Sequence, residues 1–209
     1  MELGQSESKK RVSRRVTEEE GETMTEAKII QGDCIEKMKE IKDESVDLIL
    51  TDPPYGVNKT EWDVLDLTWI KECHRILKRN GSLYIFGSVW WYPKIFFECL
   101  KLGFIIKNVI CWYYGNTMAR QDKNFQMCYD PIGFFVKSEN YTFNIDEIRV
   151  QYESIERIKH KIIKDGKVWI PNPLGKKCGN VIKVPALAGR RFRDERTEHP
   201  TQKPEKLIE

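Results

Sequence analysis

A regular alternation of strand-like and helix-like segments constrains the fold of this chain more than any other feature. Between residues 27 and 137, short runs rich in β-branched and aromatic residues are separated by stretches whose apolar residues recur at spacings of three and four. Strands are predicted at residues 28–31, 46–51, 82–86, 105–112 and 132–137, and helices between them at 35–41, 67–77 and 92–102. Such alternation is typical of an α/β domain whose sheet is mostly parallel.

Composition divides the chain into four segments. Residues 1–23 are charged and nearly devoid of apolar side chains, which predicts a disordered extension. Residues 24–137 hold the alternating pattern and form the predicted α/β core. Residues 138–198 mix polar, turn-rich and basic stretches and are predicted to be an insertion outside the sheet that carries recognition, and residues 199–209 form a final turn and the beginning of a helix.

The overall charge is mild, but its distribution is uneven. The 209 residues are 40% hydrophobic, which is enough for one domain with its own core. The 35 Lys and Arg residues against 32 Asp and Glu residues give a net charge of +3, yet residues 157–206 contain 14 basic and 5 acidic residues. This basic stretch fits a surface held against phosphates, and it fits equally well a solvated loop region.

Cysteine and histidine spacing predicts neither disulfides nor a metal site. The six cysteines are scattered without a C-x-x-C pair, and the three histidines do not combine with them at metal-ligand spacing. No apolar run approaches the roughly 18 residues of a membrane span, and the N-terminus is charged where a signal peptide would be apolar. The sequence therefore predicts a reduced, cytoplasmic protein that does not contact a membrane.

The most informative motif is Asp52-Pro53-Pro54-Tyr55, directly after the predicted strand 46–51. Open α/β sheets bind their ligands at this end of a strand. The two prolines remove N–H donors and stiffen the backbone, so Asp52 and the Pro53 carbonyl form rigid acceptors for an exocyclic amino group, while Tyr55 can stack on the attached ring. The amino nitrogen would then be aligned for attack without a covalent enzyme nucleophile. The alternative is a strand-ending turn in which Pro and Tyr only pack.

Four motifs in one order resemble a known family. They are Gly32-Asp33-Cys34, the run from Val46 to Tyr55, the run from Asn80 to Phe86, and His199-Pro200-Thr201-Gln202-Lys203-Pro204. Together they resemble the beta group of S-adenosylmethionine-dependent DNA amino-methyltransferases of restriction-modification systems, over residues 27 to 209. The resemblance implies a Rossmann-like sheet, S-adenosylmethionine as cofactor and double-stranded DNA as substrate.

The resemblance also implies roles for individual residues. Asp52, Pro53, Pro54 and Tyr55 would hold the target amino group, and Asp52 and Pro53 would also touch the methionine end of the cofactor. Asp rather than Ser at the first position favours adenine N6 over cytosine N4. The base must leave the duplex stack to reach such a pocket.

Further residues are implied to bind the cofactor and the DNA. The additional cofactor residues are Asp33, His199, Thr201, Gln202 and Lys203. For Asp33 an N-cap of the following helix is an equal alternative, and His199 is interpreted as a hydrogen-bonding or packing residue rather than a general base. Phosphate contacts are predicted for Arg190, Arg191, Arg193 and Arg196, with Lys176 and Lys177 behind them.

The sequence departs from the family pattern at its end. Family members continue past the last turn into a Gly-rich cofactor loop and a further strand, whereas this sequence stops at Glu209. The resemblance thus implies a sheet with about five of seven strands, and a lone chain is expected either to fold poorly or to repair its sheet in another way. Three alternatives stay open. The first is an enzyme completed by a missing C-terminal segment or by a second chain, with a homodimer also possible. The second is an inactive remnant that binds DNA or serves only as an interaction subunit, and the third is methylation of RNA or of a protein glutamine amide.

Overall fold

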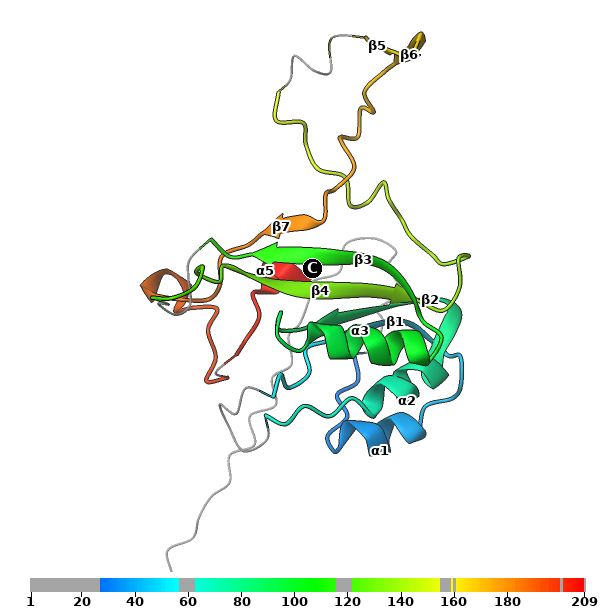
Figure 1. Cartoon of the computed structure of the whole chain (residues 1–209), viewed down its shortest axis with the longest axis vertical. Helices are drawn as coiled ribbons and strands as arrows, with labels where there is room; N and C mark the ends of the chain where they lie inside the picture. Colours follow the sequence, from blue (N-terminus) through cyan, green and yellow to red (C-terminus); the bar gives the residue numbers. More distant parts are fainter. Residues whose placement is uncertain are drawn as a thin grey trace, which may run out of the picture. The chain divides into compact units, whose positions relative to one another are not determined.

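A computed structural model describes residues 27–56, 63–115, 122–154, 159, 161–199 and 201–208 (Figure 1). Residues 1–31 and residues 32–209 form two separate units. In the first unit, residues 27–31 adopt neither helix nor strand, and Ile29 is 97% exposed. The strand predicted at residues 28–31 is therefore wrong: a strand is stabilised by pairing, and within the described ranges no strand pairs with this segment. The predicted extension of residues 1–23 lies outside the described residues.

The second unit is built on a five-stranded sheet in the order β1-β2-β4-β3-β7 (Figure 1). Its strands are β1 (Val46–Thr51), β2 (Leu77–Phe86), β3 (Ile105–Tyr113), β4 (Tyr129–Val136) and β7 (Val181–Lys183). The β1–β2 and β3–β7 pairs are parallel, whereas β4 runs antiparallel to both β2 and β3. The α/β class is confirmed, and four strands share one direction, but half of the strand pairings are antiparallel.

The strand β7 corrects the interpretation of residues 138–198. This segment was expected to lie outside the sheet, but Val181–Lys183 pairs with β3 through Cys111, Trp112 and Tyr113. A run of only three residues, Val-Ile-Lys, is too short to be recognised as a strand from sequence, and only the free edge of β3 makes it one. The same segment also forms a small hairpin of β5 (Ile162–Lys164) and β6 (Lys167–Trp169), and the 3-10 helix η1 (Arg190–Phe192).

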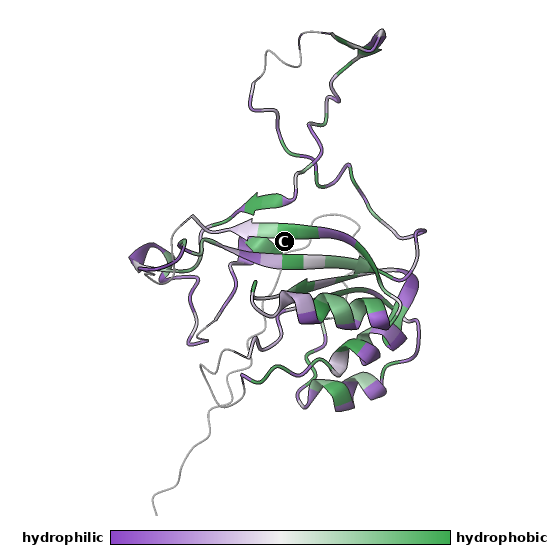
Figure 2. Cartoon of the chain, in the orientation of Figure 1, coloured by the Kyte–Doolittle hydropathy of each residue, from purple (hydrophilic) through white to green (hydrophobic). Residues whose placement is uncertain are grey.

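Three helices form as predicted, within two residues at each end. They are α1 (Cys34–Lys39), α2 (Trp69–Ile76) and α3 (Tyr92–Lys101), and a short α5 (Glu205–Ile208) closes the described chain. Each of the first three alternates hydrophobic and hydrophilic residues, as amphipathic helices do (Figure 2). The apolar faces of α2 and α3 are buried through Ile70, Cys73, Ile95 and Cys99.

Two hydrophobic clusters lie on opposite faces of the sheet. Leu83 and Ile85 pack with α2 and α3, whereas their neighbour Phe86 packs with Trp112 and Val184 in the second cluster. Successive side chains of a strand point to opposite faces, so the alternation within β2 separates the two clusters. The second cluster includes residues at the carboxyl ends of β2 and β3, and it forms one wall of the candidate functional site.

Candidate functional site

The Asp52-Pro53-Pro54-Tyr55 motif follows the carboxyl end of β1 and forms a corner in which two of its own side chains contact each other. The Tyr55 hydroxyl donates to Asp52 Oδ1 at 2.8 Å. Burial, reinforced by the nearby Asp52 carboxylate, raises the pKa of Tyr55, so the phenol remains a protonated donor. The Tyr55 hydroxyl therefore fixes the orientation of the Asp52 carboxylate, which is a hydrogen-bond acceptor.

The chain leaves this corner through a tight turn. Gly56 has φ of +67°, and its amide donates to Asp63 Oδ1 at 2.8 Å, while Asp63 is only 5% exposed. A Cβ on Gly56 would lie 2.8 Å from the Cβ of Leu65, closer than side chains tolerate. Only glycine therefore fits this position, because it accepts both the left-handed backbone and the close approach of Leu65.

The side chain of Lys203 reaches the corner from the far end of the chain. Its Nζ lies 2.6 Å from Asp52 Oδ2, and the lysine side chain is 11% exposed. The same ammonium lies over three aromatic rings, 5.3 Å from the centroid of Tyr55, 5.6 Å from Phe86 and 5.9 Å from Trp112. Distances of this size are those of cation–π contacts. Three of the predicted site residues, Asp52, Tyr55 and Lys203, are thus brought together.

Phe86 is a site residue that sequence reasoning did not identify. The motif run from Asn80 to Phe86 includes it, but no local pattern marks either Phe86 or Trp112 as a site residue. Both stand at the carboxyl ends of strands that run in the same direction as β1, so all three strand ends meet at one edge of the sheet. Trp112 is fixed there by its indole N–H, which donates to the Val184 carbonyl at 2.8 Å.

The turn that carries Lys203 is held by Gln202. The Gln202 side-chain oxygen accepts from the Thr197 amide at 2.7 Å and from the Thr197 hydroxyl at 3.0 Å. Its amide group donates to the Glu195 carbonyl at 2.9 Å, and the Glu195 carboxylate accepts from the Glu205 amide at 2.7 Å. Gln202 therefore stabilises the turn from inside, a role in addition to the predicted cofactor contact.

The other predicted cofactor residues lie in local turns. His199 Nδ1 accepts from the Thr201 amide at 3.4 Å, a long contact that belongs to the turn itself. Asp33 caps α1, where its side chain accepts from the amides of Ile35 at 3.0 Å and Glu36 at 3.1 Å. The N-cap alternative for Asp33 is confirmed, and its cofactor contact stays a prediction.

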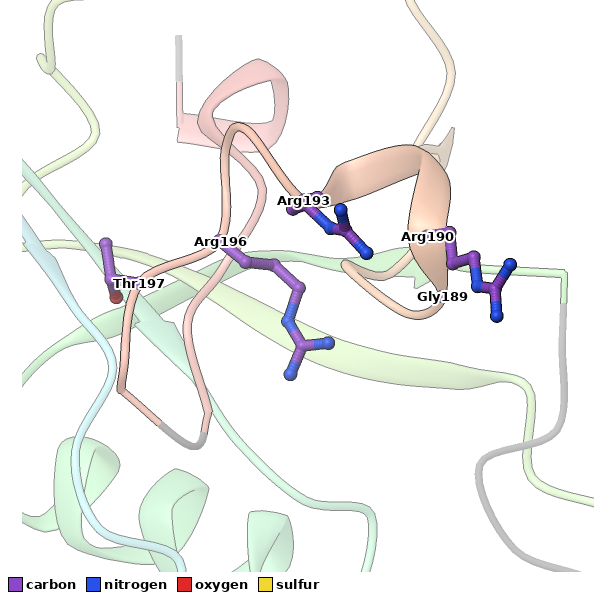
Figure 3. Close-up of a pocket in the computed structure, with 5 residues that line it drawn as sticks. All are labelled: Gly189, Arg190, Arg193, Arg196 and Thr197. Atoms are coloured by element: carbon purple, nitrogen blue, oxygen red, sulfur yellow. The ribbon is translucent and has the colours of Figure 1, made fainter.

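Three of the predicted arginines surround one hollow of about 420 Å³ (Figure 3). Arg190, Arg193 and Arg196 line it together with Gly189 and Thr197. Arg191 does not line this space, because its guanidinium lies over its neighbour Phe192, 4.6 Å from the ring centroid. Three guanidinium groups around an open space favour a bound anion.

The two predicted lysines differ in their surroundings. Lys176 forms an ion pair with Glu153, with Nζ 2.7 Å from the carboxylate, whereas Lys177 is exposed. Among the described residues, no cluster of three or more potential ligands fits a metal ion. The six cysteines are free thiols, and no helix in the described part of the chain has the length and hydrophobicity to cross a membrane.

A family model and two relatives to which this chain is similar are all DNA methylases or methyltransferases. A family model described as DNA methylase, N6_N4_Mtase, matches residues 46–209. The chain is 36% identical over 198 residues to the type II methyltransferase M1.MboII of Moraxella bovis, covering 87% of this chain and 76% of that protein. It is 40% identical over 194 residues to the DNA adenine methyltransferase YhdJ of Escherichia coli K12, covering 86% of this chain but 64% of that protein.

Solved structures share the fold. The M1.HpyAVI–SAM complex superposes with a TM-score of 0.52 at 23% identity, over 86% of this chain and 72% of that one. The cytosine-N4-specific PvuII DNA methyltransferase superposes with a TM-score of 0.59 at 15% identity, over 84% of this chain and 65% of that one. At these identities the likeness establishes the architecture, which the sequence motifs had led us to expect.

Proposed function

Because the chain belongs to the DNA methylase family, an enzyme family whose model covers residues 46–209, we propose that it transfers a methyl group from S-adenosylmethionine to adenine N6 in duplex DNA. The observation that carries this proposal is the corner at the end of β1, where Tyr55 orients the Asp52 carboxylate and aromatic rings surround the ammonium that pairs with it. Adenine is favoured by Asp at the first position of the motif and by the similarity to an enzyme named an adenine methyltransferase.

The residues of the corner fit the reaction. Asp52 and the Pro53 carbonyl would accept from the amino group, and Pro54 stiffens the backbone between Pro53 and Tyr55. When bound, S-adenosylmethionine supplies a methyl group on a cationic sulfur. The corner suits a positive charge, because it already holds the Lys203 ammonium against a carboxylate and three rings. His199, Thr201, Gln202, Lys203 and Asp33 are proposed to border the cofactor.

The charge changes of the transfer define what Asp52 does. In the transfer, the lone pair of N6 would take the methyl carbon while the electrons of the broken carbon–sulfur bond would stay on sulfur. Positive charge therefore appears on N6, where an Asp52 carboxylate within hydrogen-bond distance stabilises it before the extra proton leaves to water. The N6 group of an adenine inside the duplex is held by base pairing and stacking, so the target base would be extruded from the stack to bring N6 to Asp52.

DNA is proposed to lie against the basic segment. Arg190, Arg193 and Arg196 share one hollow and are assigned to a backbone phosphate, whose oxygens match the planar guanidinium fork. Arg191, Lys176 and Lys177 are assigned to flanking phosphate contacts. Contacts of this kind position the duplex without reading its sequence. Because such a substrate is chromosomal DNA, we place the protein in the cytoplasm.

A second chain or a second copy is proposed to cover the edge of β1. This strand pairs with β2 on one side, and among the described residues no strand pairs with its other side. Leu48 is 55% exposed and Leu50 is 41% exposed on one face of β1. Unpaired edges with exposed apolar side chains favour the addition of another strand.

The decisive experiment follows tritium from labelled S-adenosylmethionine into unmethylated genomic DNA, followed by hydrolysis and chromatography of the bases. Label in N6-methyladenine is expected. Asp52→Asn should abolish transfer with nearly unchanged DNA affinity, whereas Asp47→Asn on the same strand, where Asp47 pairs with Lys78, should transfer normally. Label in N4-methylcytosine would overturn the base assignment, and DNA binding without transfer would favour a DNA-binding remnant.

A further inference from the structure

The Lys203 side chain occupies the space that the proposed function assigns to the target nitrogen. Its Nζ lies 2.6 Å from Asp52 Oδ2, and the Tyr55 ring lies beneath it at 5.3 Å from the ring centroid. An ammonium group and an exocyclic amino group are both nitrogen donors that seek a carboxylate and an aromatic face. The Lys203 ammonium and the target amino group therefore cannot both lie beside Asp52 at the same time.

Electrostatics also makes this position incompatible with transfer. Positive charge develops on the target nitrogen as the methyl group arrives, and Asp52 is the carboxylate that would stabilise it. An ammonium 2.6 Å from the same carboxylate neutralises it and repels the developing charge. Transfer therefore requires the Lys203 ammonium to leave the corner first.

The local structure permits this movement without unfolding the turn. Gln202 holds the backbone through its bonds to Thr197 and Glu195, and the neighbouring Pro204 is buried. The lysine itself has a flexible stem of four carbons, so its head group can swing while its backbone stays in place. The Lys203 side chain can therefore move while the backbone of its turn stays in place.

We propose that the Lys203 ammonium takes the position of the target amino nitrogen beside Asp52 and Tyr55 while no base is bound, and that it leaves this position when the base enters. This role rests on the proposed function and adds a gate to it. Lys203 is then a positioning residue: it keeps the Asp52 and Tyr55 side chains in the bound arrangement and excludes other cations from the corner.

The test measures nucleoside binding, which needs neither cofactor nor a recognition sequence. Adenosine and purine riboside, which lacks the amino group, are titrated against the full chain by ligand-observed NMR. We expect Lys203→Met to bind adenosine at least tenfold more tightly than the wild type, with a much smaller gain for purine riboside. Lys206→Met, which removes the same charge from an exposed position three residues along, should bind like the wild type.

A measurement on the unmutated chain keeps the proposal testable if Lys203→Met does not fold. Saturating adenosine should raise the acetylation rate of Lys203 by acetic anhydride several-fold relative to Lys206, because the displaced ammonium enters solvent. The proposal is overturned if Lys203→Met binds adenosine no better than wild type, or if adenosine leaves the labelling of Lys203 unchanged or protects it. Methyl transfer is scored separately: nucleoside displacement without any transfer refutes the proposed function only, and transfer without displacement refutes the gate only.

Discussion

The Tyr55 hydroxyl and the Asp52 carboxylate, three residues apart, are joined by a hydrogen bond of 2.8 Å that holds one oxygen of the acid while Lys203 holds the other. The acid at the end of β1 is therefore oriented from two directions. One partner is local in sequence, and the other is 151 residues away.

Removing the Tyr55 hydroxyl should slow methyl transfer while the aromatic ring stays in the site. Tyr55→Phe keeps the ring over which the Lys203 ammonium lies but removes the donor to Asp52. We expect kcat to fall about tenfold, the equivalent of roughly 1.4 kcal/mol, as for the loss of one hydrogen bond to a charged group. Tyr141→Phe, at a ring that packs on Phe134 away from the corner, is the matched control. Equal rates for Tyr55→Phe and wild type would show that Asp52 is oriented without Tyr55.

Adding a methyl group at Gly56 should destabilise the fold through two effects. The left-handed backbone costs about 1–2 kcal/mol for a non-glycine residue, and the contact with Leu65 adds roughly 1–3 kcal/mol of overpacking. Gly103→Ala isolates the first effect, because Gly103 has φ of +91° and only an ordinary neighbour at 3.9 Å. Urea unfolding should therefore show a larger loss for Gly56→Ala. Equal losses would mean that Leu65 moves aside freely.

Neutralising one arginine of the hollow should weaken DNA binding in a salt-dependent way. Arg196→Gln or Arg193→Gln is expected to reduce the slope of log affinity against log salt by about one for each lost phosphate contact. Arg191→Gln should change the slope less, because its guanidinium stacks on Phe192 outside the hollow. Fluorescence anisotropy with a labelled duplex at several salt concentrations measures this. A uniform response of all three variants would indicate a diffuse basic surface rather than a defined phosphate site.

Thiol reactivity should report the core between α2 and α3. Cys73 is 2% exposed and Cys99 is fully buried, and burial raises the pKa of both thiols to about 12. Because the thiolate is the reactive form, both should react with N-ethylmaleimide at pH 8 about a thousandfold more slowly than an ordinary exposed thiol. Cys34 is exposed and serves as the internal reference, read by mass spectrometry of peptides. Comparable labelling of all three would mean that this core opens readily.

The sequence predicted local features well because local rules produce them. The spacing of apolar residues located α2 and α3, and the β-branched run before Asp52 located β1 at its observed bounds. Asp33 was recognised as a possible N-cap because a side-chain acceptor two to three residues before free amides is sufficient for that role. The same rules failed for residues 28–31, whose strand-like composition finds no partner among the described residues, and for β7, whose three residues become a strand only beside β3.

By itself, the sequence determined the acidic, proline-stiffened corner at the end of a buried strand and the helices around it, since these depend on neighbours within a few positions. Only the tertiary structure decided that Phe86, Trp112 and Lys203 surround Asp52. Which strand ends meet depends on strand order and direction, and β4 enters the sheet antiparallel between β2 and β3 without any local signal of its place. The periodicity of the sequence determines on which face of the sheet a side chain lies, because it is a local property. The neighbours of that side chain depend on long-range strand pairing, which only the tertiary structure decides.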